Sequence, residues 1–278
     1  MRIAMAQISS GTDPEANLAT VGQAAAVAAT GGAALVVFPE ATMCRFGVPL
    51  GPVAQPLDGP WAQAVSEIAA ARQITVIAGM FTPAADGRVR NTLLLARPDG
   101  TRIGYHKIHL YDAFGFRESD TVAAGDAAVV VDVDGVGVGL TTCYDIRFPA
   151  LFTALAARGA QVIVTAASWG AGPGKVAQWQ TLATARALDA TAFVVALGQA
   201  EPTDAAARTG RAPTGIGHSQ ISDPFGSVVA SYEQHAHVGI HDLDVARVAT
   251  AREQLAVLAN QRDFRILTDP TTPEDLHA

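Results

Sequence analysis

Short apolar runs alternate with helical segments along most of this 278-residue chain. Runs at residues 33–40, 74–80, 160–168 and 190–199 read as strands, and the first has the continuous apolar character of a strand buried on both faces. Helical patterns lie between them, and one begins at Asp13-Pro14-Glu15 with the capping chemistry of a helix N-terminus. The alternation predicts a sheet system covered by helices.

The middle and the end of the chain add hairpin signals to this pattern. Pro98-Asp99-Gly100 and Asp134-Gly135 each separate two β-like runs, and residues 223–226 (DPFG) join two more. The total of roughly ten to twelve strands is too many for one comfortable open sheet. We therefore expect two mixed sheets packed face to face, each covered by helices. No repeat, linker or composition shift interrupts residues 1–278, which predicts a single domain.

Charge and composition exclude several classes of partner. The chain has 19 basic and 26 acidic residues, a net charge of −7 at pH 7, which does not favour nucleic acid or an anionic membrane. No window approaches the roughly 18 apolar residues of a membrane span, and the N-terminus lacks a signal-peptide core. Cys44 and Cys143 form neither a disulfide framework nor a metal-site spacing. We expect a cytoplasmic protein with reduced thiols.

Three strand-like runs carry side chains that can do chemistry. Residues 35–40 (LVVFPE) end at Glu40, residues 103–112 (IGYHKIHLYD) carry Lys107, and residues 138–149 (VGLTTCYDIRFP) carry Cys143. Sites in α/β sheets form just beyond the carboxyl ends of strands. The three side chains are therefore candidates to converge in one site.

Each of these side chains also has a structural alternative. Cys143 precedes a polar elbow whose backbone N–H groups favour a thiolate, but lone cysteines are usually small core residues. The alternation of side chains along a strand would point Lys107 inward, where it could stabilise negative charge on a carbonyl oxygen. The alternative is a solvated lysine on an edge strand. Glu40 would serve as general base and acid beside a thiol, or as a cap. Cys44 lacks such an elbow, and we assign it a structural role.

The segments around these residues resemble motifs of the carbon–nitrogen hydrolase (nitrilase) superfamily. Residues 37–40 (VFPE) resemble its glutamate motif, residues 106–112 (HKIHLYD) its lysine motif, and residues 143–149 (CYDIRFP) its nucleophile motif, the most specific of the three. Further matches follow in family order over nearly the whole chain: Leu57-Asp58-Gly59-Pro60, Trp179 with Arg186-Ala187, and Gly217-His218-Ser219 with Asp223-Pro224. The resemblance implies a four-layer αββα sandwich that forms a homodimer or a larger homo-oligomer.

The resemblance also implies a catalytic triad of Glu40, Lys107 and Cys143. Glu40 would take the thiol proton, and Lys107 with the backbone N–H of Tyr144 would hold the oxyanion. Loss of ammonia would leave a thioester, which water activated by Glu40 would hydrolyse. Glu118 matches a second glutamate that the family places beside the lysine; the alternative is an exposed loop acid. The expected partner is a small amide, with no metal and no cofactor.

Three histidines suggest a different mechanism. His106, His109 or His218 could form a papain-like pair with Cys143, but His109 and His218 fall in family motifs that give them no catalytic role. No pair of these residues has the local spacing of zinc ligands. We therefore expect neither a Cys–His pair nor a zinc site.

Within the superfamily, the chain most resembles the branch that acts on small ω-amides of dicarboxylic acids and on deaminated glutathione. It departs from that branch in a short segment at 111–117, in Ser168-Trp169-Gly170 and in Ala190-Thr191. These departures leave the acyl group open. Three side chains are candidates for substrate contact: Trp169, Arg147 and Arg117. The two arginines could anchor a carboxylate or form structural ion pairs.

Two rival functions remain from the sequence. A nitrile hydrolase or an N-carbamoyl amino acid hydrolase would use the same triad. A non-catalytic binding protein on this fold would be expected to have lost part of the triad, which this chain retains in full.

Overall fold

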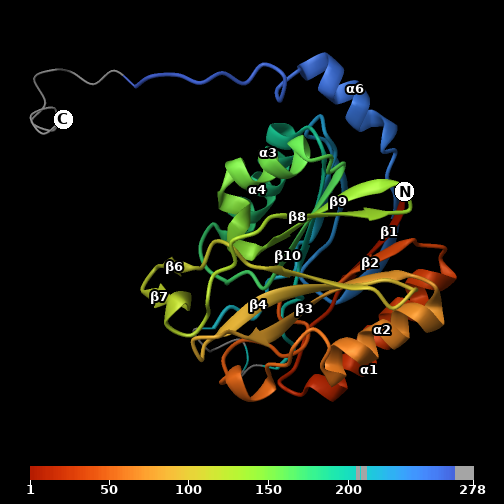
Figure 1. Cartoon of the computed structure of the whole chain (residues 1–278), viewed down its shortest axis with the longest axis vertical. Coiled ribbons are helices and arrows are strands. Elements are labelled where there is room, and N and C mark those ends of the chain that lie inside the picture. The colour runs from red at the N-terminus through yellow and green to blue at the C-terminus, as the bar shows by residue number, and fades with distance from the viewer. Residues whose placement is uncertain (205–206, 208–211, 267–278) are drawn as a thin grey trace, which may run out of the picture.

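The computed structural model describes residues 1–204, 207 and 212–266, and its strands form two six-stranded mixed sheets (Figure 1). The first sheet has the spatial order β14 (His237–Asp242), β1 (Arg2–Gln7), β2 (Leu35–Val37), β3 (Thr75–Pro83), β4 (Val89–Ala96) and β5 (Arg102–His106). The second has the order β13 (Val228–Ser231), β12 (Gln220–Ser222), β11 (Phe193–Gly198), β10 (Val162–Ala167), β9 (Val136–Thr142) and β8 (Val129–Val133). A separate hairpin consists of β6 (Asp112–Ala113) and β7 (Phe116–Arg117).

The two sheets share one plan. In each, three parallel strands in the middle are flanked by antiparallel strands: β1, β2 and β3 in the first sheet, and β9, β10 and β11 in the second. The parallel strands are joined by helical crossovers, as the parallel arrangement requires. The expected pair of mixed sheets is confirmed.

Helices cover the outer face of each sheet. The α-helices and the shorter 3-10 helices are α1 (Pro14–Thr30), α2 (Pro60–Arg72), α3 (Pro149–Ala157), α4 (Lys175–Ala190), α6 (Ala246–Leu255), η1 (Gly51–Val53), η2 (Glu118–Asp120) and η3 (Cys143–Arg147). Helices α1 and α2 pack on the first sheet, and α3 and α4 pack on the second. Over the described residues, we find no helix that combines the length and the apolarity needed to cross a bilayer.

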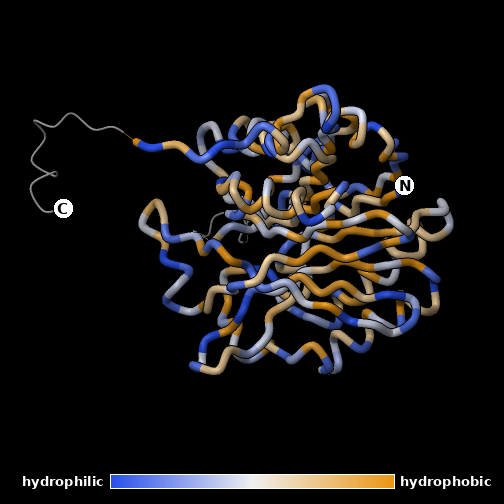
Figure 2. Tube along the Cα trace, turned by 45° about the horizontal axis from the view of Figure 1, so that its top comes forward, coloured by the Kyte–Doolittle hydropathy of each residue, from blue (hydrophilic) through white to orange (hydrophobic). Residues whose placement is uncertain are grey.

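The alternation of side chains along the strands produces three apolar layers. In β2, Leu35 and Val37 point into the core between the sheets, and Val36 points toward α1 and α2. Leu95 of β4 and Leu140 of β9 meet in the same inter-sheet core. Figure 2 shows the hydrophobic residues concentrated along the central strands. The order helix, sheet, sheet, helix is the predicted αββα sandwich.

The helix boundaries follow local chemistry, with one difference from the prediction. Asp13 caps α1, as expected, by accepting a hydrogen bond from the backbone N–H of Glu15, and Gly31 follows the last residue of the helix. The sequence predicts a helix from Gln178 to Asp189, but α4 begins three residues earlier, at Lys175. Gly174 adopts a left-handed conformation (φ +70°) before it, which lets the chain turn directly into the helix.

The fold places the ends of strands from both sheets at one edge. Strand β2 leads to Glu40 and β5 to Lys107 in the first sheet, while β9 leads to Cys143 and β10 to Ser168 in the second. The segments that follow these strands therefore meet where the two sheets adjoin.

Candidate active site

Cys143 lies at a sharp turn between β9 and η3. Its backbone adopts a left-handed conformation, with φ of 49°. A residue other than glycine rarely adopts such a φ, and strained backbone of this kind is concentrated at functional sites. The residue is half-buried and lines a cavity, unlike the fully buried Cys44.

Asp145 holds this turn in place. Its buried carboxylate accepts hydrogen bonds from the backbone N–H of Thr142 (2.8 Å), from the hydroxyl of Tyr105 (2.6 Å) and from the backbone N–H of His109 (3.0 Å). His109 Nδ1 lies 2.7 Å from the same carboxylate. The turn that carries Cys143 is thereby tied to the segment that carries Lys107.

Glu40, Lys107 and Glu118 form a buried ion network beside Cys143. Lys107 Nζ donates to Glu40 Oε1 at 3.2 Å and to Glu118 Oε1 and Oε2 at 3.1 and 2.8 Å. The three side chains are 4% exposed or less, so their charges interact through a poorly screened environment. Glu118 is thus not the exposed loop acid that was the alternative reading of the sequence.

Two hydrogen-bond donors to which the sequence assigned no role in the triad orient Glu40. Asn91 Nδ2 donates to Glu40 Oε1 at 2.7 Å and to Glu118 Oε1 at 3.4 Å. The backbone N–H of Ser168 donates to Glu40 Oε2 at 2.7 Å. Each oxygen of Glu40 therefore has a fixed partner from a different sheet.

The electrostatics of the network favour a neutral thiol. Burial raises the pKa of Cys143 well above its ordinary value; the charge of Glu40 adds to this and that of Lys107 opposes it. Burial also raises the pKa of Glu40, against the opposing charge of Lys107. Burial alone would lower the pKa of Lys107, but Glu40 and Glu118 together outweigh it and raise that pKa well above its usual range.

This result corrects one expectation from the sequence. Backbone N–H groups at the elbow were expected to favour the thiolate of Cys143. Instead, the turn leads into a 3-10 helix of only five residues, whose dipole is small. Burial and the charge of Glu40 raise the pKa of Cys143 by more than this dipole could lower it. The site therefore favours the neutral thiol over the thiolate.

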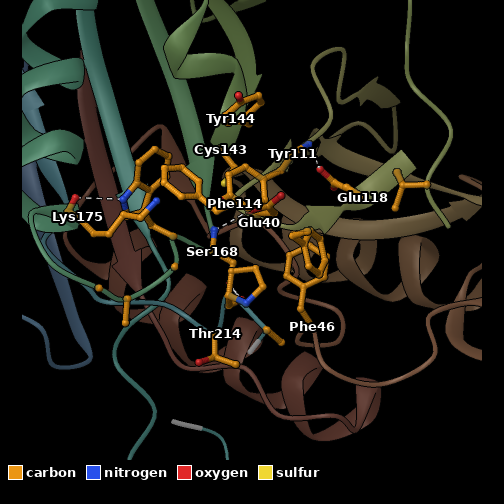
Figure 3. Close-up of a pocket in the computed structure, with 18 of the residues that line it drawn as sticks. Glu40, Phe46, Tyr111, Phe114, Glu118, Cys143, Tyr144, Ser168, Lys175 and Thr214 are labelled. Carbon is orange, nitrogen blue, oxygen red and sulfur yellow. Dashed lines mark hydrogen bonds between the residues drawn. The ribbon is translucent and has the colours of Figure 1, made fainter. Parts of the chain in front are cut away.

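Cys143 faces a cavity of about 510 Å³, within the range of small-molecule sites. Glu40, Lys107 and Glu118 line the same cavity. Much of its wall is aromatic: Phe46, Tyr111, Phe114, Phe116, Tyr144 and Trp169. Figure 3 shows the labelled side chains Glu40, Phe114 and Tyr111 gathered around Cys143. A flat or extended organic group would fit such a site.

The predicted substrate-contact residues divide into two groups. Tyr144 and Trp169 line the cavity, as expected. Arg147 does not line it: its guanidinium stacks over the rings of Trp169 (5.3 Å) and Tyr144 (5.9 Å) and donates to Gln178 Oε1. Arg117 is 73% exposed beside Asp120 and also lies outside the cavity wall.

Lys175 is a charged lining residue that the sequence did not predict. Lys175, at the start of α4, lines the cavity with its ammonium 4.3 Å from the centre of the Phe114 ring. The predicted helix began after it, and a lysine in a glycine-rich loop has no distinguishing pattern. Only the tertiary contact reveals it.

The histidines have structural contacts. His109 stacks on Phe148 at 3.7 Å besides contacting Asp145, and His106 Nδ1 lies 2.9 Å from the hydroxyl of Thr92. The carbonyl of His218 accepts from the indole of Trp179. None of the cavity-lining residues in the described chain is a histidine, and the described residues contain no cluster of His, Cys, Asp and Glu able to hold a metal.

Comparisons with known proteins identify the family of the chain. A family model described as carbon-nitrogen hydrolase matches residues 2–253. The chain is 61% identical over 270 residues to a protein of Mycobacterium tuberculosis named Hydrolase Rv0480c. The alignment covers 95% of this chain and 96% of that protein. It is 36% identical over 241 residues to the deaminated glutathione amidase of Escherichia coli (85% and 88% covered), and 32% identical over 242 residues to human omega-amidase NIT2 (84% and 85% covered).

A solved structure gives the same result for the fold. A glutamate-to-glutamine mutant of the amidase from Nesterenkonia sp. AN1 superimposes with a TM-score of 0.79 at 25% identity, over 94% of each chain. That amidase carries the acetamide moiety of fluoroacetamide covalently added at its active site cysteine. Together with the sequence matches, this likeness shows that the chain belongs to the carbon–nitrogen hydrolase family of the nitrilase superfamily.

Proposed function

We propose that this chain hydrolyses the C–N bond of a small primary amide, releasing ammonia and a carboxylic acid through a thioester on Cys143. The observation that carries the proposal is the buried network of Glu40, Lys107 and Glu118 against a strained Cys143 that lines the same cavity. It supplies a base, an electrostatic stabiliser and a nucleophile within one cavity.

In the first half of the reaction, Glu40 accepts the proton of the Cys143 thiol as the sulfur bonds to the amide carbon. The carbonyl oxygen becomes an oxyanion, which the ammonium of Lys107 and the backbone N–H of Tyr144 stabilise. Glu40 then returns the proton to the departing nitrogen and the C–N bond breaks. Ammonia departs, and the acyl group remains on Cys143 as a thioester. The raised pKa of Glu40 suits it to hold a proton for this purpose.

In the second half, Glu40 accepts a proton from water while the water oxygen attacks the thioester carbon. The same two donors stabilise the new oxyanion, the C–S bond breaks, and the proton returns to the sulfur of Cys143. Asn91 and the backbone N–H of Ser168 keep the Glu40 carboxylate oriented through both halves. Glu118 keeps Lys107 protonated and in place.

The amidase relatives support amide hydrolysis over the hydrolysis of nitriles or N-carbamoyl amino acids and over non-catalytic binding. The deaminated glutathione amidase and omega-amidase relatives are named for amide substrates, and no described residue of the cavity points specifically to a nitrile or to a carbamoyl group. A binding protein without catalysis would have no use for a strained Cys143 beside a general base.

A substrate panel tests this proposal. Ammonia release would be measured with ω-amides, neutral aliphatic amides, nitriles and N-carbamoyl amino acids. We expect turnover with amides and at least roughly tenfold lower kcat/KM with the other two classes. Preference for a nitrile or a carbamoyl compound would overturn the substrate assignment. Silence on the whole panel, with no mass added to the protein, would support the binding function instead.

A further inference from the structure

Phe114 and Phe116 are large apolar side chains that remain exposed on the wall of the cavity. Phe114 is 79% exposed and Phe116 41% exposed, and both line the cavity that contains Cys143 (Figure 3). Apolar surface in contact with water is unfavourable, and a patch of it in a concave place is typical of a binding site. The two rings indicate that the cavity receives an apolar group that covers them.

The exposed rings are part of one aromatic surface. The ring of Tyr111 lies 6.4 Å from that of Phe114, 6.0 Å from that of Phe116 and 5.1 Å from that of Tyr144, measured between ring centres. All four rings line the cavity, and so does Trp169. Most of this surface comes from the two segments beside the site at which the sequence departs from the ω-amide branch. The acyl group is therefore expected to differ from the one that branch accepts.

Phe114 is also unfavourable for its own turn. It lies with Gly115 between β6 and β7, and both residues have positive φ, 55° and 74°. A two-residue hairpin turn with two positive φ values favours asparagine or aspartate before the glycine, and other side chains are strained there. A phenylalanine that is both strained and exposed does not stabilise the hairpin. Contact with a ligand gives it a role that folding does not.

Lys175 makes this wall better suited to an aromatic group than to an aliphatic one. Its ammonium lies 4.3 Å from the centre of the Phe114 ring and 5.9 Å from the centres of Tyr111 and Trp169. An aliphatic group laid against this wall would remove water from the ammonium without replacing its interactions. The face of an aromatic ring attracts a cation and compensates for part of that loss.

We infer that the substrate is a primary amide whose acyl group carries an aromatic ring, and that Phe114 determines specificity by packing against that ring. The inference rests on the proposed function and adds the chemical class of the acyl group. The cavity of about 510 Å³ has room for it, because a carboxamide at Cys143 needs only a small part of a volume in the range of drug-sized ligands. A short linker joins the ring to the amide.

Four amides test the substrate class: 3-phenylpropanamide, 3-cyclohexylpropanamide, propanamide and the monoamide of glutaric acid. We expect kcat/KM of the wild type to be about tenfold or more higher for the phenyl compound than for propanamide, because the ring covers exposed apolar surface. It should exceed the cyclohexyl value by about twofold or more, because only the aromatic ring attracts the ammonium of Lys175. A cyclohexyl value equal to the phenyl value, or a higher value for the glutaric monoamide, would overturn the inference.

Phe114→Ala tests the residue. The ratio of kcat/KM for 3-phenylpropanamide to that for propanamide should fall by about fivefold or more, mainly through KM, because a contact remote from the reacting bond is the same before and in the transition state. Phe114→Tyr should retain most of the ratio. Phe264→Ala is the matched control, because Phe264 is 84% exposed and lies outside the cavity wall, and the ratio should stay within about twofold. An equal fall in both kcat/KM values in Phe114→Ala would indicate an effect through the hairpin and overturn the role of Phe114.

A binding measurement keeps the inference independent of turnover. Isothermal titration calorimetry on Cys143→Ala would give the Kd of 3-phenylpropanamide and of propanamide. The phenyl compound should bind about tenfold or more tightly, and adding Phe114→Ala should remove most of the difference. Equal Kd values for the two amides would contradict the inference.

The two proposals fail in distinguishable ways. If none of the four amides is hydrolysed, the proposed function fails. If propanamide or the glutaric monoamide is hydrolysed as well as 3-phenylpropanamide or better, the proposed function stands and the aromatic acyl group is wrong.

Discussion

Asn91 and Glu40 illustrate at the residue scale how a buried polar partner sets the chemistry of a carboxylate. Burial raises the pKa of Glu40, while the hydrogen bonds from Asn91 and from the backbone of Ser168 lower it. The residual shift leaves a carboxylate that gains a proton more readily than a free glutamate, whose pKa is about 4.3. Because Glu40 must be ionised to act as a base, its titration controls activity at acidic pH.

The ionisation of Glu40 should be visible in the pH dependence of activity. kcat/KM should fall as the pH drops through the raised pKa of Glu40, so the acidic limb should lie above the ordinary glutamate pKa of about 4.3. Asn91→Ala removes a hydrogen bond that lowers this pKa and should move the limb to higher pH. The pH dependence of kcat/KM for both proteins provides the measurement. A limb that stays in place or moves to lower pH would count against Glu40 as the base.

The sequence predicted which side chains meet in the site better than it predicted their partners. Glu40, Lys107 and Cys143 each lie in a motif specific enough to be read along the chain, and the structure brings them together. Asn91 reads only as a polar residue in a strand, and Lys175 as a loop lysine. Their contacts join segments from different elements, so no local pattern could identify them.

At the scale of elements, the loop after β2 is held by its neighbour β3. Gly79 of β3 donates its N–H to the carbonyl of Pro39, and its carbonyl accepts from Met43. A Cβ at Gly79 would lie 2.5–2.8 Å from backbone atoms of Pro39, Glu40 and Ala41. The absence of a side chain at this position lets the loop approach the strand closely enough to place Glu40.

Gly79→Ala should therefore disturb the site through the backbone. We expect kcat to fall by at least about tenfold, because small displacements of a catalytic group are costly, together with a loss of about 1–3 kcal/mol of stability from overpacking. Gly51→Ala is the control, because a Cβ there meets no atom within 4 Å. Activity assays and urea unfolding of both variants give the comparison. Full activity in Gly79→Ala would show that this approach does not position Glu40.

The elements themselves were largely predictable, and the exceptions have local causes. The apolar run before Glu40 yields only three strand residues because Pro39, which has no N–H to donate, ends the pairing. The segment after Lys107 forms the small hairpin of β6 and β7, although its sequence has no alternating pattern. Phe114, with φ of 55°, and Gly115 make its turn.

At the scale of the whole molecule, the two sheets share a single inter-sheet core. Leu95 of the first sheet and Leu140 of the second lie in it, both fully buried. Because each sheet buries one face against the other, we propose that residues 1–278 unfold as one domain. The predicted homo-oligomer and cytoplasmic location stay predictions, which light scattering and cell fractionation would test.

Leu95→Ala tests the shared core. The cavity it creates should cost about 2–5 kcal/mol of stability and leave the unfolding transition single. Leu255→Ala, at a side chain 41% exposed, should change stability by no more than about 0.5 kcal/mol. Urea unfolding would be followed by circular dichroism and by tryptophan fluorescence, since Trp61 packs on the first sheet and Trp179 on the second. Separate transitions for the two probes would contradict the single domain.

The central claim is that the reaction passes through a thioester on Cys143. Intact-mass spectrometry after rapid acid quench of an amide turnover tests it most directly. We predict that the wild type gains the mass of the acyl group on Cys143 and loses it with hydroxylamine. Cys143→Ala should show neither adduct nor ammonia while keeping the wild-type circular dichroism. Ammonia release by Cys143→Ala, or an acyl group on another residue during turnover, would contradict the claim.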